Sequence, residues 1–127
     1  MRPIIVRDEE PPDDTVVVVR GGEMNGDTVR RTASDAFDEF GIYTVSVFLA
    51  LDDTVEVLCR DRPELQRYGK VRLATAGRLR ILGFALVPTL DRPHYDVVLP
   101  DLADATLDRL ELGFDRPIPN PARSGSD

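Results

Sequence analysis

The stretch that decides the fold is TVVVVRGG, residues 15–22. Its first five residues are all β-branched, a side-chain type that favours extended backbone. Four valines in a row leave no polar face, so the run predicts a strand that is buried on both sides within a sheet. Arg20 ends the apolar run, and Gly21 and Gly22 predict a turn directly after it.

The pattern that follows this strand predicts a helix over residues 27–40. Asn25-Gly26-Asp27 offers a turn with a good N-cap, and Gly41 stands where a C-capping glycine belongs. The apolar residues between them recur at helical spacing: Val29, Ala33, Ala36, Phe37 and Phe40.

The rest of the chain alternates between strand and helix patterns, with no internal repeat. Strands are expected at residues 42–50, 70–75, 84–87 and 95–99. Helices are expected at residues 53–60, 76–82 and from Asp104 onward, with a further turn over residues 63–68. The order predicts an α+β domain: a mixed sheet of about five strands with three to four helices packed on it.

The length of 127 residues suits one domain, which we place at residues 15–114. Residues 1–14 are acidic and broken by prolines, so we expect a mobile lead-in. Residues 115–127 contain three prolines and end in Arg-Ser-Gly-Ser-Asp, so we expect a loose tail.

Composition excludes several classes of protein. No apolar run approaches the roughly 18 residues that a membrane span needs, and no signal peptide is recognisable. Cys59 is the one cysteine and His94 the one histidine, so neither a disulfide nor a metal site is predicted. We expect a cytoplasmic protein that does not bind membranes.

The net charge of −7 argues against general nucleic-acid binding, but the charge is unevenly distributed. Residues 60–80 hold seven basic and two acidic side chains. Arg78 and Arg80 follow the turn at Thr75 on a short predicted helix, and with Arg72 they could bind an anion. The alternative is a solvated face with exposed arginines, and the sequence leaves both interpretations open.

Arg20-Gly21-Gly22 is the first candidate binding site. An arginine at the exit of a strand presents a planar fork that suits phosphate or carboxylate, and glycines allow a ligand to approach the backbone. The alternative is a strand end followed by a turn. The motif is neither a P-loop nor the Gly-x-Gly-x-x-Gly fingerprint of dinucleotide-binding folds.

Three polar residues on later strands are the other candidates. Ser46 stands in the middle of an apolar strand, where a buried hydroxyl needs a partner. His94 and Asp96 stand at the entrance of the last strand, and any histidine-dependent general base must be His94. The alternatives are that the Ser46 hydroxyl forms a hydrogen bond within the sheet and that His94 is an ordinary surface residue. A Ser46–His94–Asp96 triad can be written, but no nucleophile elbow accompanies it.

Four segments together resemble a group of small proteins from high-GC Gram-positive bacteria. The segments are VVVRGG, TVSVF, VRLATAGRLR and RPHY, and the resemblance covers about residues 16–121. It implies no function.

Arg20 and Ser46 also resemble, in type and order, the first two residues of the Arg–Ser–Glu class of ADP-ribosyltransferases. The resemblance implies that Arg20 contacts a phosphate or ribose of NAD and that Ser46 supports the site. It also implies a glutamate that assists ribosyl transfer. Here the chain departs from the class, because the later glutamates fall in predicted helices and Asp96 is the acid nearest a strand end.

Three functions remain open on this basis. The favoured one is a small toxin or effector with an ADP-ribosyltransferase-like NAD site. Its expected catalytic residues are Arg20, Ser46, His94 and Asp96, and its expected cofactor-binding residues are Arg20, Gly21, Gly22, Tyr43 and Tyr95. The alternatives are an antitoxin-like or regulatory protein-binding domain, and an RNA-directed toxin that uses residues 60–80. The favoured function requires Arg20, Ser46 and His94 to meet in one cleft.

Overall fold

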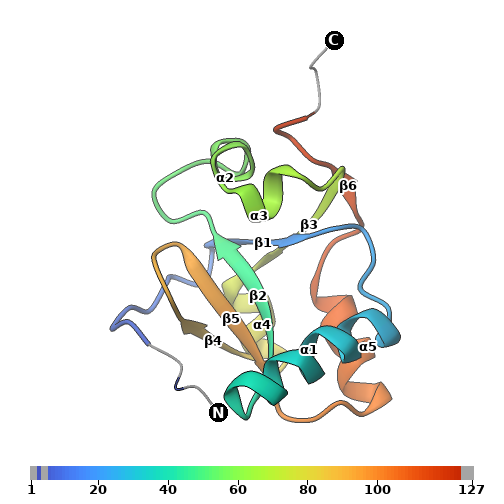
Figure 1. Ribbon diagram of the computed structural model, residues 1–127. Helices are drawn as coiled ribbons and strands as arrows, with labels where there is room; N and C mark the ends of the chain where they lie inside the picture. Colours follow the sequence, from blue (N-terminus) through green and yellow to red (C-terminus); the bar gives the residue numbers. More distant parts are fainter. Residues whose placement is uncertain (1–2, 4–5, 124–127) are drawn as a thin grey trace.

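The computed structural model describes residue 3 and residues 6–123, and residues 1, 2, 4, 5 and 124–127 of the lead-in and tail lie outside this part. The described chain forms one sheet with helices on both faces (Figure 1). The strands are β1 (Val16–Arg20), β2 (Tyr43–Leu49), β3 (Lys70–Thr75), β4 (Ala85–Pro88), β5 (His94–Leu99) and β6 (Ile118–Pro119). The helices are α1 (Gly26–Phe40), α2 (Val55–Asp61), α3 (Pro63–Gln66), α4 (Ala76–Ile81) and α5 (Asp104–Gly113).

The α+β class is confirmed, but the sheet differs from the expected one in two ways. Its order is β4-β5-β2-β1-β3-β6, so the described sheet has six strands rather than five. Every strand pair is antiparallel, whereas a mixed sheet was predicted. The reason is that α1 returns the chain to the end of the sheet at which β1 stops, so β2 runs back beside β1.

The local signals around α1 act as the sequence predicts. The Thr28 N–H donates to the Asn25 side chain over 2.9 Å, which caps the first turn. Gly41 has φ 81°, and its N–H donates to the Phe37 carbonyl, which closes the helix. A left-handed φ is costly for residues with a Cβ, so glycine is the residue that suits this position.

β1 separates two cores of unequal size. Val17 and Val19 face a large core with residues of α4 and α5, while Val18 faces a smaller core under α2 and α3. In the view of Figure 1, α2 and α3 lie above the β1–β3 part of the sheet, and α1, α4 and α5 lie below. The three valines are at most 4% exposed, as expected for a strand buried on both sides.

The lead-in is attached to the β4–β5 hairpin. The Arg7 guanidinium donates to the carbonyls of Thr89 and Leu90, and Val6 forms a β-bridge with Thr89. Glu9 accepts a hydrogen bond from the Tyr95 hydroxyl. Residues 6–9 of the expected lead-in are therefore in contact with the hairpin.

The tail is attached to β3, also in contrast to the expected loose segment. β6 pairs with Lys70 and Val71. Asn120 is 1% exposed, and its side-chain amide donates to the carbonyls of Leu65 and Tyr68 over 2.9 and 2.8 Å. Asn120 therefore satisfies the backbone at the end of α3. None of the described helices is long and apolar enough to cross a membrane.

We expect Asn120→Ala to destabilise the domain by about 2 kcal/mol, because two buried carbonyls lose their donor. Urea unfolding measures the change. Arg116→Ala is the matched control, since Arg116 is an exposed residue of the same segment. Equal stability of the Asn120 variant and the wild type would contradict the anchoring role.

We expect Tyr95→Phe to flatten the pH dependence of stability at both ends. The Tyr95 hydrogen bond, with Arg7 and Arg92 nearby, lowers the pKa of Glu9 below 4.5, so this stabilisation is present above that pH and is lost as pH falls below it. Burial, with Glu9 nearby, raises the pKa of Tyr95 to about 12. This second contribution is present below the ordinary value of 10 and is lost as pH rises from there toward 12.

Urea midpoints measured across acid and alkaline pH test this expectation. Tyr43→Phe is the control, because it removes a tyrosine hydroxyl elsewhere in the domain, on a ring that stacks on Phe37. The same pH profile for the wild type and Tyr95→Phe would refute the coupling.

Candidate functional site

The site begins where the sheet opens between β1 and β2. The two strands pair only at Val17 with Leu49 and at Val18 with Phe48. On its other side, β1 pairs with β3 along its whole length. Arg20 and Ser46 therefore lie past the end of the β1–β2 ladder. A cavity of about 400 Å³ occupies this region, with Arg20, Gly21, Gly22 and Ser46 in its wall.

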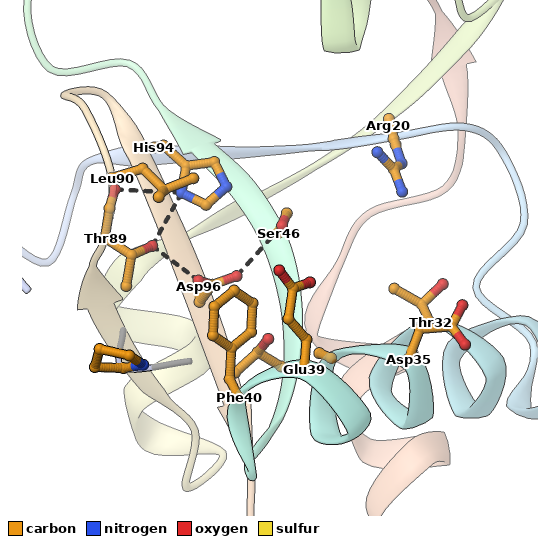
Figure 2. Close-up of a pocket in the computed structure, with 13 residues that line it drawn as sticks. Arg20, Thr32, Asp35, Glu39, Phe40, Ser46, Thr89, Leu90, His94 and Asp96 are labelled. Carbon is orange, nitrogen blue, oxygen red and sulfur yellow. Dashed lines mark hydrogen bonds between the residues drawn. The ribbon is translucent and has the colours of Figure 1, made fainter. Parts of the chain in front are cut away.

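A larger cavity of about 700 Å³ adjoins this opening (Figure 2). We call it the main pocket. β1, β2 and β5 form its floor, α1 forms one wall, and the loop before β5 forms the opposite wall. Its lining residues are Pro3, Arg20, Thr32, Asp35, Ala36, Glu39, Phe40, Thr44, Ser46, Thr89, Leu90, His94 and Asp96.

A hydrogen-bonded chain of four side chains crosses the floor of the main pocket. The sheet register places Ser46 opposite Asp96, and the Ser46 hydroxyl donates to one Asp96 oxygen over 3.3 Å. The Thr89 hydroxyl donates to the other Asp96 oxygen over 2.8 Å. Thr89 Oγ1 also lies 2.9 Å from His94 Nδ1. The buried carboxylate thus has two donors, as a buried charge requires.

The partners of His94 determine which ring nitrogen carries the proton. Nδ1 lies 3.3 Å from the Thr89 carbonyl, which can only accept, and the Thr89 hydroxyl already gives its hydrogen to Asp96. We therefore assign the proton to Nδ1. In the neutral ring, Nε2 then has a free lone pair, and Figure 2 shows the ring edge opposite Nδ1 turned toward the pocket. This is the arrangement that a general base needs.

The charges of the main pocket are divided between its ends. Arg20 lies on the β1 side and makes no ion pair with any described residue. Its guanidinium lies 5.7 Å from the Tyr68 ring. Asp35 and Glu39 extend from α1 and, with Asp96, make the other side acidic (Figure 2). A ligand with one anionic part and one cationic or hydroxyl-rich part would complement such a surface.

The structure brings together Arg20, Ser46, His94 and Asp96 in the main pocket. The two predicted tyrosines lie elsewhere. Tyr43 stacks on Phe37 with ring centroids 4.6 Å apart. Tyr95 is buried in the large core on the opposite sheet face, because neighbouring residues of a strand point to opposite sides. Neither tyrosine lines the main pocket.

The predicted anion-binding arginines also lie outside the main pocket, and all three have partners. Arg72 is 7% exposed and donates to the Asp115 carbonyl over 2.8 Å. Arg78 pairs with the Asp115 carboxylate over 3.1 Å, and Arg80 pairs with Asp13. These side chains connect the tail and the lead-in to the domain, and each has an acidic or carbonyl partner.

Sequence reasoning missed Thr89 and the acidic wall of α1. The prediction of the helix 27–40 used only its apolar residues. The polar residues that line the pocket are spaced three and four positions apart, which places them on one side of the helix: Thr32, Asp35 and Glu39. Nothing in the sequence marks Thr89, which sits between two short strands. Its role arises from the β4–β5 hairpin, which sets Thr89 beside His94 and Asp96.

Comparisons with known proteins add no assignment to this geometry. No protein-family model, no curated protein and no solved structure matches the chain. Within the described residues, no group of three or more histidine, cysteine, aspartate or glutamate side chains could hold a metal ion. The chemistry of the main pocket therefore has to be argued from its own side chains.

We expect the neutral His94 ring to carry its proton on Nδ1, the less common tautomer in water. Nitrogen-15 NMR of the imidazole measures this, and no assignment is needed because the chain has one histidine. Thr89→Val should shift the mixture toward the Nε2–H form, since Nδ1 loses its nearest acceptor. A wild-type ring protonated on Nε2 would contradict the assignment.

Proposed function

We propose that this protein is a small ADP-ribosyltransferase-like enzyme, of the toxin or effector kind, that binds NAD in the main pocket. One observation carries the proposal. Arg20, Ser46, His94 and Asp96 come from three strands and line the same cavity, although 76 positions separate the first from the last. Arg20 and Ser46 are also the two residues that match the Arg–Ser–Glu class in type and order.

The shape and charge of the main pocket support a ligand of this class. Its volume of about 700 Å³ falls within the range of roughly 300–1,000 Å³ that small-molecule sites occupy. Arg20 offers a guanidinium to a phosphate. Asp35 suits ribose hydroxyls and the positive charge of a nicotinamide ring, and Phe40 provides an aromatic side chain in the same pocket.

The proposed reaction uses the free edge of His94. The bond between C1′ of the ribose and the ring nitrogen breaks, and its electron pair leaves with nicotinamide, which becomes neutral. Positive charge develops on the ribose, where the carboxylates of the pocket stabilise it. An acceptor hydroxyl or water forms the new bond to C1′ and gives its proton to Nε2 of His94. Asp96, through Thr89, keeps the ring in the required tautomer.

The alternatives have less support. An RNA-directed toxin would use the basic residues of the segment 60–80, but Arg72, Arg78 and Arg80 are committed to acidic or carbonyl partners. A protein-binding domain would need a large apolar patch rimmed by acids. The large apolar side chains exposed in the described chain come from three helices and three connecting segments: Val6, Phe37, Ile42, Ile81, Leu90 and Leu112.

We expect purified protein to release nicotinamide from NAD, and Arg20→Ala to reduce the rate by about a hundredfold, the effect of removing one preorganised electrostatic contact. Chromatographic detection of nicotinamide measures the rate. Arg31→Ala is the matched control, because Arg31 is exposed on α1 and does not line the main pocket.

Expression in a bacterial host provides a second readout. Growth arrest by the wild type, relieved by Arg20→Ala and retained by Arg31→Ala, would support an active site. If the wild type neither turns over NAD nor binds it, the proposed function is refuted and a protein-binding role is favoured.

A further inference from the structure

A second hollow, of about 300 Å³, adjoins the main pocket on the side of α2 and α3. It shares Arg20, Ser46, Leu90 and His94 with the main pocket. It adds Phe48 and Arg62, and two acids, Glu64 and Asp91. We call it the Arg62 hollow. Arg62 is one of the seven basic residues in the segment 60–80.

The proline that follows Arg62 determines its backbone conformation. Arg62 precedes Pro63, and the proline ring disfavours helical backbone in the residue before it. Arg62 has extended backbone, φ −101° and ψ 113°, and so separates α2 from α3. At this break its guanidinium lies 5.2 Å from the centre of the ring of Phe48, which also lines the Arg62 hollow. The aromatic face restricts where the guanidinium can go.

Arg62 is equipped for a ligand that the described chain does not supply. Its Nε is buried and has no hydrogen-bond partner, and it makes no ion pair with any described residue. In contrast, seven other arginines, Arg7, Arg30, Arg60, Arg72, Arg78, Arg80 and Arg92, each pair with a carboxylate. Buried Nε atoms without a partner also occur at Arg7 and Arg109, so the feature that distinguishes Arg62 is its place in the wall of the hollow.

Arg20 and Arg62 reach the same hollow from different elements. Arg20 comes from β1, Arg62 from the α2–α3 junction, and Phe48 and Ser46 lie on the strand between them. Two guanidinium forks that share one small hollow match the two adjacent anionic centres of a diphosphate. Glu64, whose Oε2 is also buried without a hydrogen-bond partner, and Asp91 lie in the same wall and repel an anion, so the hollow suits only a compact anion that both guanidinium groups contact.

We propose that Arg62 and Arg20 together bind a diphosphate group in the Arg62 hollow, while the rest of the ligand extends into the main pocket. The ligand class is then a nucleoside diphosphate or a dinucleotide joined by a diphosphate. The inference deepens the proposed function, since NAD contains this group. Diphosphate recognition itself is independent of what chemistry follows.

Calorimetric titration of the full-length protein with inorganic pyrophosphate and with ADP-ribose tests the inference. Arg62→Ala should weaken the binding of each probe about tenfold, which corresponds to roughly 1.4 kcal/mol. Arg20→Ala should do the same, and adenosine should bind equally well to the wild type and Arg62→Ala. Arg60→Ala is the matched control, because Arg60 lies on α2, is exposed and pairs with Asp61 outside the hollow.

A second variant distinguishes a loss of binding from a loss of folding. Arg62→Lys keeps a cation at the α2–α3 junction but loses the planar fork, so it should fold as the wild type does and still bind ADP-ribose more weakly. Urea unfolding confirms the fold. ADP-ribose binding at wild-type strength by a folded Arg62→Lys and a folded Arg62→Ala would overturn the diphosphate site.

The outcomes separate this inference from the proposed function. Arg62-dependent binding of pyrophosphate without any NAD turnover would retain the diphosphate site and remove the NAD enzyme. NAD turnover that depends on Arg20 but not on Arg62 would retain the enzyme and remove the diphosphate site. Binding of neither probe by the wild type would remove the diphosphate site.

Discussion

Val17 and Val18 are the residues of β1 that pair with β2, and past them the ladder between the two strands stops. A strand with three buried valines could pair along its whole length, as β1 does with β3. Ending the ladder early leaves Arg20 and Ser46 unpaired on the sides where β1 and β2 face each other, although Arg20 still pairs with Val71 and Ser46 with Asp96, and it creates room for a ligand between the two strands. The large core on the opposite face compensates for the lost pairing, since α4, α5 and part of α1 cover it continuously.

The floor of the main pocket is polar at a place where apolar residues would stabilise the sheet more. Thr89, His94 and Asp96 are each at most 8% exposed, and they are costly to bury unless they satisfy one another. The hydrogen bonds from Thr89 and Ser46 to Asp96 meet that requirement, and the partners of Nδ1 leave Nε2 of His94 available. Such buried polar networks are typical of functional sites, where residues needed for catalysis or binding make the fold less stable than apolar residues would.

The distribution of ion pairs explains how an acidic chain can present cations to a ligand. Most of the arginines that form ion pairs connect segments far apart in the chain. Arg92 pairs with Glu9 of the lead-in, Arg80 pairs with Asp13, and Arg78 pairs with Asp115 of the tail. Arg20 and Arg62 are different because both face cavities and neither pairs with a described acid. The positive charges of Arg20 and Arg62 can therefore interact with a ligand in these cavities.

The sequence by itself determined the buried strand, the capped helix 27–40 and the α+β class, because β-branched runs, helical spacing and capping residues act over a few positions. It also marked Arg20, Ser46 and His94 as unusual for where they stand. Only the tertiary structure decided the antiparallel order, the sixth strand, the role of Thr89 and the pairing of Arg72, Arg78 and Arg80. These depend on contacts between residues far apart in the chain, such as the register that sets Ser46 opposite Asp96. Local patterns do not encode such contacts, so whether polar residues form one site is settled only when the strands pair.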